Sequence, residues 1–211
     1  MKDIIIVGAS GFGREVAQYL EDINASGNAP EWNILGYLDD NLQALDGIEH
    51  TYKVIGRIKD HVPVEGAFYT CALAMPGTKE YVATLLEDRG AKFVTIIHPT
   101  ARISAFAKIG HGCIITPNSN VNVDAEIGNF VAVLASGIGH DAKVGDYSTL
   151  SGHVCVNGHV TVGRSAYLGC GALIAPGKRI GDGATVGIGS VVISNVKPGV
   201  TVFGNPAKKL I

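Results

Sequence analysis

The sequence predicts a small α/β domain followed by a parallel β-helix, and two observations carry this prediction. In residues 1–96, short apolar runs alternate with a helical pattern, as in an α/β unit. In residues 97–211 an aliphatic side chain recurs at every sixth position with one exception, at Ile97, Ile103, Ile109, Ile115, Val121, Ile127, Val133, Ile138, Val144, Leu150, Val156, Val162, Leu168, Ile174, Ile180, Val186 and Val192. A period of six fits neither a helix nor a lone strand. It fits a solenoid of three-sided coils in which each hexapeptide forms one side, so that residues 18 apart stack.

The exception lies between Val133 and Ile138, which are five residues apart instead of six. One missing residue would exchange the inward and outward side chains unless the chain bulges or changes a corner. We expect such a change just before Gly139-His140-Asp141, and a break in a regular pattern beside titratable groups indicates a site.

Composition excludes several classes of function. Apolar residues make up 46% and charged residues 17% of the 211, which suits a folded core, and the net charge of −2 offers no basic surface for nucleic acid or membrane. The first apolar run, Ile4 to Val7, is too short for a signal or a membrane span. The four cysteines have no metal-ligand spacing and are expected to be reduced thiols in the cytosol. Only 11 charged residues lie in positions 97–196, which suggests that coil faces meet another subunit.

The N-terminal residues predict a strand, a glycine-rich turn and a helix. Ile4 to Val7 is apolar on both faces, as in a buried parallel strand, and Val16, Ala17, Leu20 and Ile23 form one helical face after Gly8–Gly13. Such a turn presents backbone N–H groups to a phosphate. The spacing differs from the dinucleotide fingerprint, and Arg14 stands where a longer form of it needs glycine, which disfavours NAD. A tight turn without a ligand is the alternative.

Three further strands and one helix are expected in this domain. Trp32 to Leu38 ends at Asp39-Asp40, where an acid can bind a ribose or sugar hydroxyl, or else cap the following turn. Phe68 to Ala74 predicts the next strand. A helix from Lys79 to Arg89 with Thr78 as N-cap follows, and a last strand, Phe93 to Ile97, leads into the coils.

His140 is the candidate catalytic residue. A transfer reaction to an amine or hydroxyl needs a base to take the proton of the attacking group, and a histidine with a pKa of about 6.5 suits neutral pH. Asp141 could fix its tautomer, but neighbouring residues on a strand point to opposite faces, so the backbone must bend there. A solvated histidine is the alternative. His153 and His159 are six apart and so lie on successive faces, and no metal site is expected.

The repeat, together with the ending Val202-Phe203-Gly204-Asn205-Pro206-Ala207-Lys208-Lys209, resembles the left-handed β-helix of hexapeptide-repeat acyltransferases. The whole chain resembles the sialic acid O-acetyltransferase family. Within that family it is most similar to the enzymes that acetylate the amino group of nucleotide-linked 4-amino-sugars. The resemblance implies a Rossmann-like domain, a homotrimer with active sites between subunits, and acetyl-CoA as donor. It assigns His140 as base and Asp141 as its partner. It also assigns the nucleotide-sugar to Gly11, Phe12 and Gly13 near the phosphates and to Asp39 and Asp40 near the nucleoside.

Coil stacking predicts where the CoA arm lies. Starting near His140, we expect a column of Gly152, Cys170 and Ile188, flanked by Gly158 and Pro176, with Cys170 lining the arm and not acting as nucleophile. Thr149 stands where the resembling enzymes often have a second histidine near the thioester, and Phe12 also replaces a histidine.

The function expected from the sequence is therefore acetyl transfer from acetyl-CoA to the amine, at C4, of a nucleotide-linked amino-sugar in the making of a bacterial surface glycan. O-acetylation of a sugar and a non-catalytic nucleotide-sugar-binding scaffold are the alternatives.

Overall fold

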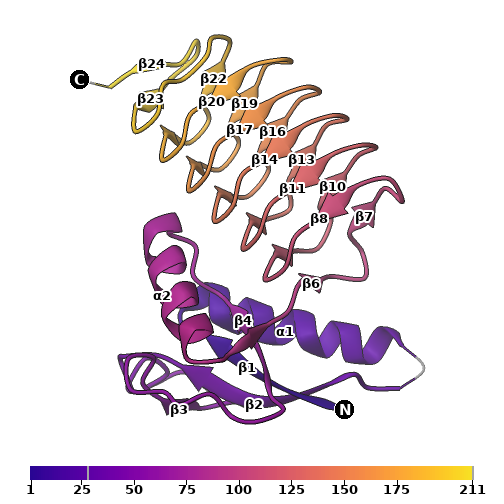
Figure 1. Cartoon of the computed structure of the whole chain (residues 1–211), viewed down its shortest axis with the longest axis vertical. Coiled ribbons are helices and arrows are strands. Elements are labelled where there is room, and N and C mark those ends of the chain that lie inside the picture. The colour runs from indigo at the N-terminus through magenta and orange to yellow at the C-terminus, as the bar shows by residue number, and fades with distance from the viewer. Residues whose placement is uncertain (28, 211) are drawn as a thin grey trace.

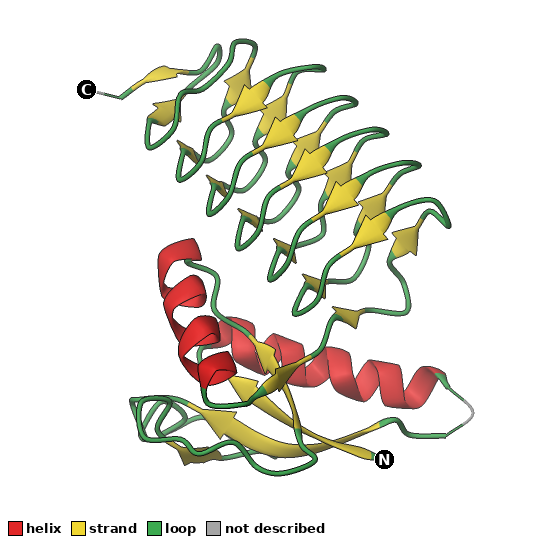
Figure 2. Ribbon diagram, in the orientation of Figure 1, coloured by secondary structure: helices red, strands yellow, loops and turns green. Residues whose placement is uncertain are grey.

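The computed structural model describes residues 1–27 and 29–210 and contains the two parts that the sequence predicts (Figure 1). An α/β domain lies against one side of a stack of coils, which Figure 2 shows as short strands joined by turns. The elements of the α/β domain are β1 (Lys2–Val7), α1 (Gly11–Ser26), β2 (Trp32–Leu38), β3 (Val54–Gly56), β4 (Phe68–Cys71), α2 (Pro76–Asp88) and β5 (Lys92–Phe93).

The five strands of this domain form one parallel sheet in the order β3-β2-β1-β4-β5. Successive side chains of β1 point to opposite faces. Ile4 and Ile6 pack with α1, whereas Ile5 and Val7 pack with α2, so one helix covers each face of the sheet. Neither helix, of 16 and 13 residues, has the length and hydropathy needed to cross a membrane, and no other helix of the described chain does.

Three boundaries in this domain differ from the prediction. The helix α2 begins at Pro76, with Met75 as N-cap, because proline is favoured in the first helical turn, so the prediction of Thr78 as N-cap was wrong. Strand β4 ends at Cys71, three residues early. The predicted last strand is two strands: β5 pairs with β4, and Ile96–Ile97 pairs inside the coils.

The coils form three parallel sheets that close a triangular solenoid, and the β-helix prediction is confirmed. The β7–β22 sheet contains β7 (Arg102–Ile103), β10 (Asn120–Val121), β13 (Gly137–Ile138), β16 (Cys155–Val156), β19 (Leu173–Ile174) and β22 (Val191–Val192). The β8–β20 sheet contains β8 (Lys108–Ile109), β11 (Glu126–Ile127), β14 (Lys143–Val144), β17 (Thr161–Val162) and β20 (Arg179–Ile180). The β6–β24 sheet contains β6 (Ile96–Ile97), β9 (Ile114–Ile115), β12 (Ala132–Val133), β15 (Thr149–Leu150), β18 (Tyr167–Leu168), β21 (Thr185–Val186), β23 (Thr201–Phe203) and the antiparallel β24 (Lys208–Lys209).

The periodic aliphatic residues fill the inside of the coils. From Ile115 to Val192 they belong to one continuous buried cluster. Full burial of one such side chain contributes about 1.5–3 kcal/mol, so the repeat itself supplies the stability of the solenoid. Outward neighbours in the same two-residue strands alternate with them and carry the surface chemistry.

The five-residue step shortens a corner, as predicted. The turn between β12 and β13 has three residues, and Asn120 and Val121 pair with Gly137 and Ile138. Because the residue is lost from the turn, Ile138 still points inward and is fully buried.

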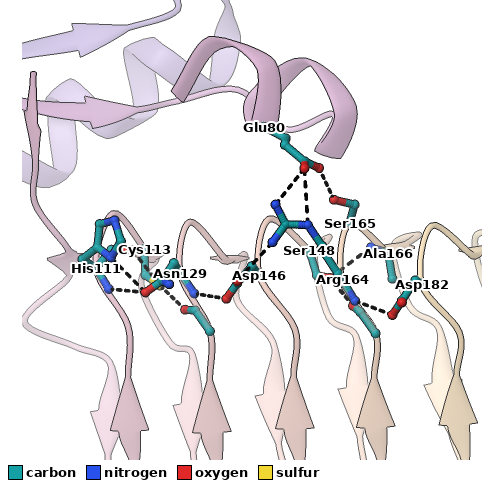
Figure 3. A network of polar contacts seen from close by, with 12 residues as sticks. Glu80, His111, Cys113, Asn129, Asp146, Ser148, Arg164, Ser165, Ala166 and Asp182 are labelled. Carbon is teal, nitrogen blue, oxygen red and sulfur yellow. Dashed lines mark hydrogen bonds and ion pairs between the residues drawn. The ribbon is translucent and has the colours of Figure 1, made fainter. Parts of the chain in front are cut away.

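The α/β domain packs on the β6–β24 side of the solenoid through α2. The rings of Phe130 and Tyr147 stack in parallel with their centroids 5.2 Å apart. Both residues belong to the same buried cluster as Val82 and Leu86 of α2. Figure 3 shows the polar edge of this contact, where Glu80 of α2 binds Arg164 at 2.7 Å and Ser165 at 2.6 Å. The hydrogen bond with Ser165, and after it the bond with Arg164, lowers the pKa of Glu80, so this carboxylate stays charged.

Candidate active site

His140 lies on an open corner of the solenoid, in the turn between β13 and β14. The imidazole is half exposed and its Nδ1 is 2.8 Å from Oδ2 of Asp141. Asp141 has a φ of 57°, in the left-handed region. This is the backbone bend that the sequence requires for adjacent residues to meet, and aspartate tolerates it better than most residues.

The hydrogen bond between the two residues is oriented so that His140 can act as a general base. The hydrogen bond to His140 lowers the pKa of Asp141, so the carboxylate is ionised at neutral pH and accepts the proton of Nδ1. In a neutral imidazole only one nitrogen carries the proton. The lone pair is therefore on Nε2, which is free to take a proton from a nucleophile.

Gly158 leaves Nε2 accessible. It stacks 18 residues after His140, and a Cβ added there would lie 2.6 Å from Nε2 and 2.7 Å from Cε1. Gly158 does not have a positive φ, so the backbone can accommodate an alanine, whose nearest contacts would be with the imidazole.

Gly158→Ala is expected to lower kcat by up to about 10²-fold, because a shift of about 1 Å at a catalytic group can have that cost. Steady-state kinetics and a thermal melt test this. An unchanged melting temperature with a reduced kcat is the expected result, whereas full activity would show that the imidazole does not work in the position seen here.

His159 is a neighbour of this pair that the sequence reasoning missed. Its Nδ1 is 3.9 Å from Oδ2 of Asp141, and its ring meets that of His140 edge-on with centroids 5.0 Å apart. The signal was available, because 159 is 18 after 141 and the two residues must stack. His159 was compared only with His153, six residues away, so its stacking over Asp141 was missed.

The expected CoA column and the two residues that flank it lie at two different corners of the solenoid. Gly158 and Pro176 share the corner of His140, between the β7–β22 and β8–β20 sheets. Gly152, Cys170 and Ile188 lie at the other edge of the β7–β22 sheet, where Cys170 and Ile188 are exposed. The column of Gly152, Cys170 and Ile188 is stacked as expected, but it lies one corner away from His140, since 152 is two hexapeptides from 140 and not three. That CoA binds along it stays a prediction.

Thr149 is not available to a cofactor in this chain. It is fully buried under α2, where its hydroxyl donates to the carbonyl of Ala74 at 2.7 Å and accepts from Nζ of Lys79 at 2.9 Å. We therefore correct its assignment to CoA: Thr149 joins the two domains.

The glycine-rich turn opens α1 as predicted. Gly11, Phe12 and Gly13 are the first residues of the helix, where N–H groups have no partner within the helix itself. A Cβ on Gly13 would collide with the carbonyl of Gly8, so this glycine lets the helix approach β1. Gly11 faces open space, since a Cβ added there would meet Nη2 of Arg14 no closer than 3.9 Å. This is the position from which a phosphate can be bound.

The carboxylates of Asp39 and Asp40 accept hydrogen bonds from backbone N–H groups. Oδ2 of Asp39 accepts from the N–H of Ala9 at 2.9 Å, and Oδ1 accepts from the N–H of Asn41 at 2.9 Å. Oδ1 of Asp40 accepts from the N–H of Lys59 at 3.1 Å. Asp39 therefore caps the turn into Asn41, which was the alternative interpretation, and also fixes the glycine-rich turn, whereas Asp40 holds the segment of Lys59. Binding of the nucleoside by either acid stays a prediction.

Comparison with known proteins agrees with this architecture. Residues 3–96 match the model of the PglD N-terminal domain family. GDP-perosamine N-acetyltransferase of Escherichia coli O157:H7 is 30% identical over 85 residues, which are 40% of this chain and 38% of the relative. UDP-N-acetylbacillosamine N-acetyltransferase of Bacillus subtilis (strain 168) is 30% identical over 119 residues, 54% of this chain and 51% of the relative. The α/β domain of the chain is therefore similar to the PglD N-terminal domain family.

The likeness to a solved structure extends over both domains. The acetyltransferase domain of PglB from Neisseria gonorrhoeae FA1090, solved with acetyl coenzyme A, has a TM-score of 0.88 and 27% identity over 99% of either chain. The matches to the two curated relatives span less than two thirds of their lengths. The α/β domain and the solenoid therefore occur together in a known structure.

Proposed function

We propose that this protein transfers the acetyl group of acetyl-CoA to the amine of a nucleotide-linked amino-sugar, at C4, in the synthesis of a bacterial surface glycan. The observation that carries the proposal is the His140–Asp141 pair on an acyltransferase-like solenoid. Nε2 of His140 stays accessible there because residue 158 is a glycine. The relatives named for GDP- and UDP-linked amino-sugar acetylation support the acceptor class, and the acetyl-CoA complex of PglB supports the donor. The proposed location is the cytoplasm.

The reaction needs one proton acceptor. As the sugar amine attacks the thioester carbon, Nε2 of His140 takes the amine proton, and the ionised Asp141 stabilises the imidazolium that forms. Collapse of the tetrahedral intermediate breaks the C–S bond, and the imidazolium returns the proton to the thiolate of CoA. No covalent acyl-enzyme forms, so Cys170 is proposed to line the donor site together with Gly152 and Ile188.

The active site is proposed to lie between two copies of the chain. The His140 corner is opposite the β6–β24 sheet, and the α/β domain of the same chain packs on that sheet. The glycine-rich turn at Gly11–Gly13 therefore serves a histidine of another chain, as in the expected homotrimer.

The β7–β22 sheet is the proposed contact between copies. From β10 onward its outward residues are uncharged, at Asn120, Gly137, Cys155, Leu173 and Val191. The outward residues of the β8–β20 sheet are mostly charged, at Lys108, Glu126, Lys143, Thr161 and Arg179. The β7–β22 sheet also joins the corner of Gly158 to that of Gly152, so a second copy there would enclose both parts of the donor site.

Sedimentation velocity tests this arrangement. The wild-type chain is expected to sediment as a trimer, and Leu173→Glu, which puts a charge on a side chain that is 45% exposed in one chain, is expected to give monomers with little activity. Thr161→Glu on the charged sheet is the matched control and should stay trimeric. A monomeric and fully active wild type would contradict the composite site.

The function itself is tested by thiol release from acetyl-CoA with a panel of GDP-, UDP- and dTDP-linked 4-amino-sugars and the matching hydroxy-sugars. Release with amino-sugars alone is the expected result. Release with hydroxy-sugars alone would make the protein an O-acetyltransferase, and binding of nucleotide-sugar without release would make it a scaffold. Either outcome would overturn the proposal.

A further inference from the structure

The corner of His140 brings together three side chains that can bind a transition metal. His140, Asp141 and His159 each offer one ligand atom, and the three atoms lie within 4.8 Å of one another. Nδ1 of His140 and Nδ1 of His159 are 2.8 and 3.9 Å from the same carboxylate oxygen of Asp141. Ligands around a tetrahedral zinc are about 3.3 Å apart, from bond lengths of about 2.0–2.1 Å, so small side-chain movements would complete the set.

The backbone places these ligands before any ion arrives. Asp141 and His159 occupy the same position in successive coils and have nearly the same left-handed φ, 57° and 58°. The coils are joined there by backbone hydrogen bonds from Asp141 to Val123 at 3.1 Å and from His159 to His140 at 3.0 Å. The coil stacking therefore fixes the spacing of the three residues.

We propose that this cluster binds Zn²⁺ or a similar divalent transition metal, and that the ion is an inhibitor and not a cofactor. Two imidazole nitrogens and one carboxylate oxygen are a ligand set that suits zinc and leaves one position for water. The binding rests on the geometry alone. The inhibition rests on the proposed function, in which His140 is the base.

Inhibition follows from the tautomer of His140. The base needs its proton on Nδ1, towards Asp141, and its lone pair on Nε2. A metal on Nδ1 uses that lone pair, so the proton of the neutral ring must move to Nε2. Nε2 then has no lone pair for the amine proton. The ion also takes the carboxylate that would stabilise the imidazolium, so both parts of the pair are lost at once.

The experiment uses the full-length, tag-free protein carrying Cys155→Ser and Cys170→Ser, so that thiols outside the cluster do not bind the metal. Calorimetric titration with Zn²⁺ is expected to show one site per chain. Because even the loss of a group that only supports a ligand weakens metal binding by about 10–100-fold, His159→Asn is expected to raise the dissociation constant at least about tenfold. Asparagine tolerates the left-handed φ at this position. His153→Asn, which has a similar φ of 61° at another corner, is the control and should bind as the parent does.

Activity gives the second measurement. Zn²⁺ is expected to inhibit the parent, and the concentration for half-inhibition, taken relative to the metal-free rate of each protein, should rise at least about tenfold in His159→Asn. No binding by the parent, or equal binding by His159→Asn, would overturn the site. Binding without inhibition in an active enzyme would overturn the regulatory role. If no acceptor is acetylated, the titration still decides the binding, so failure of the proposed function is told apart from failure of the site.

Discussion

Replacing His140 by alanine is expected to lower kcat for acetyl transfer by about 10²- to 10⁴-fold, the usual contribution of one acid–base group. The imidazole is the group that combines a free Nε2, a carboxylate on Nδ1 and an open approach over Gly158. The KM for acetyl-CoA should change little, because alanine removes a proton acceptor and leaves the coil turn in place.

His111→Asn is the matched control for this substitution. His111 also lies in a turn between coils and is also half exposed beside a carboxylate, Glu87, at 3.0 Å. Its corner is a different one, and the loss of an exposed ion pair changes stability by about 1 kcal/mol or less. We expect this variant to keep its activity. Equal losses in both variants would mean that His140 acts through folding, and an unaffected His140→Ala enzyme would remove it from the mechanism.

Spacing alone was enough to predict the solenoid and the shortened corner at Val133–Ile138, because each inward residue is set by a local period. The same arithmetic, applied at 18 residues, places His159 over Asp141 and Gly158 over His140. It also separates Gly152 from that corner. These relations were present in the sequence, and counting corners as well as coils places the Gly152 column one corner from His140.

The contacts between the domains could not be predicted in the same way. Thr149 is an outward residue of β15, and only the docking of α2 turns that outward face into a buried one. The roles of Asp39 and Asp40 depend likewise on which N–H groups distant segments bring near, at Ala9 and Lys59. Sequence patterns report on period and local propensity, whereas these side chains are defined by pairs of segments far apart in the chain.

Lys79 is the clearest example, because a lysine on a helix is normally a solvent-facing residue. Here it is 2% exposed, and its Nζ donates to the carbonyl of Ser148 at 3.1 Å and to the hydroxyl of Thr149 at 2.9 Å. Both acceptors are neutral, and burial raises the pKa of the nearby thiols of Cys71 and Cys113 to about 12 and 11, so they carry no charge at neutral pH. Burial lowers the pKa of Lys79 from 10.5 to about 8.

This shift costs stability at neutral pH. Below pH 8 the amine is charged in both the folded and the unfolded chain, and burying that charge costs about 3 kcal/mol, the free-energy equivalent of the change in pKa. Between pH 8 and 10.5 the unfolded state binds more protons than the folded state, so this contribution to stability rises with pH. The cost has disappeared above pH 10.5, where both states are neutral.

Lys79→Met is therefore expected to be more stable than the wild type at pH 7. The gain is the cost of about 3 kcal/mol less about 1 kcal/mol for each of the two lost hydrogen bonds, which leaves about 1 kcal/mol. The two acceptors keep other contacts, since Thr149 still donates to Ala74 and the carbonyl of Ser148 still accepts from Ala132. The advantage should shrink and reverse as the pH rises from 8 to 10.5. Denaturant unfolding at a fixed protein concentration measures both effects, with the exposed Lys108→Met as control. A variant that is less stable at pH 7 would show that the bonds of Lys79 to the solenoid outweigh the cost of its burial.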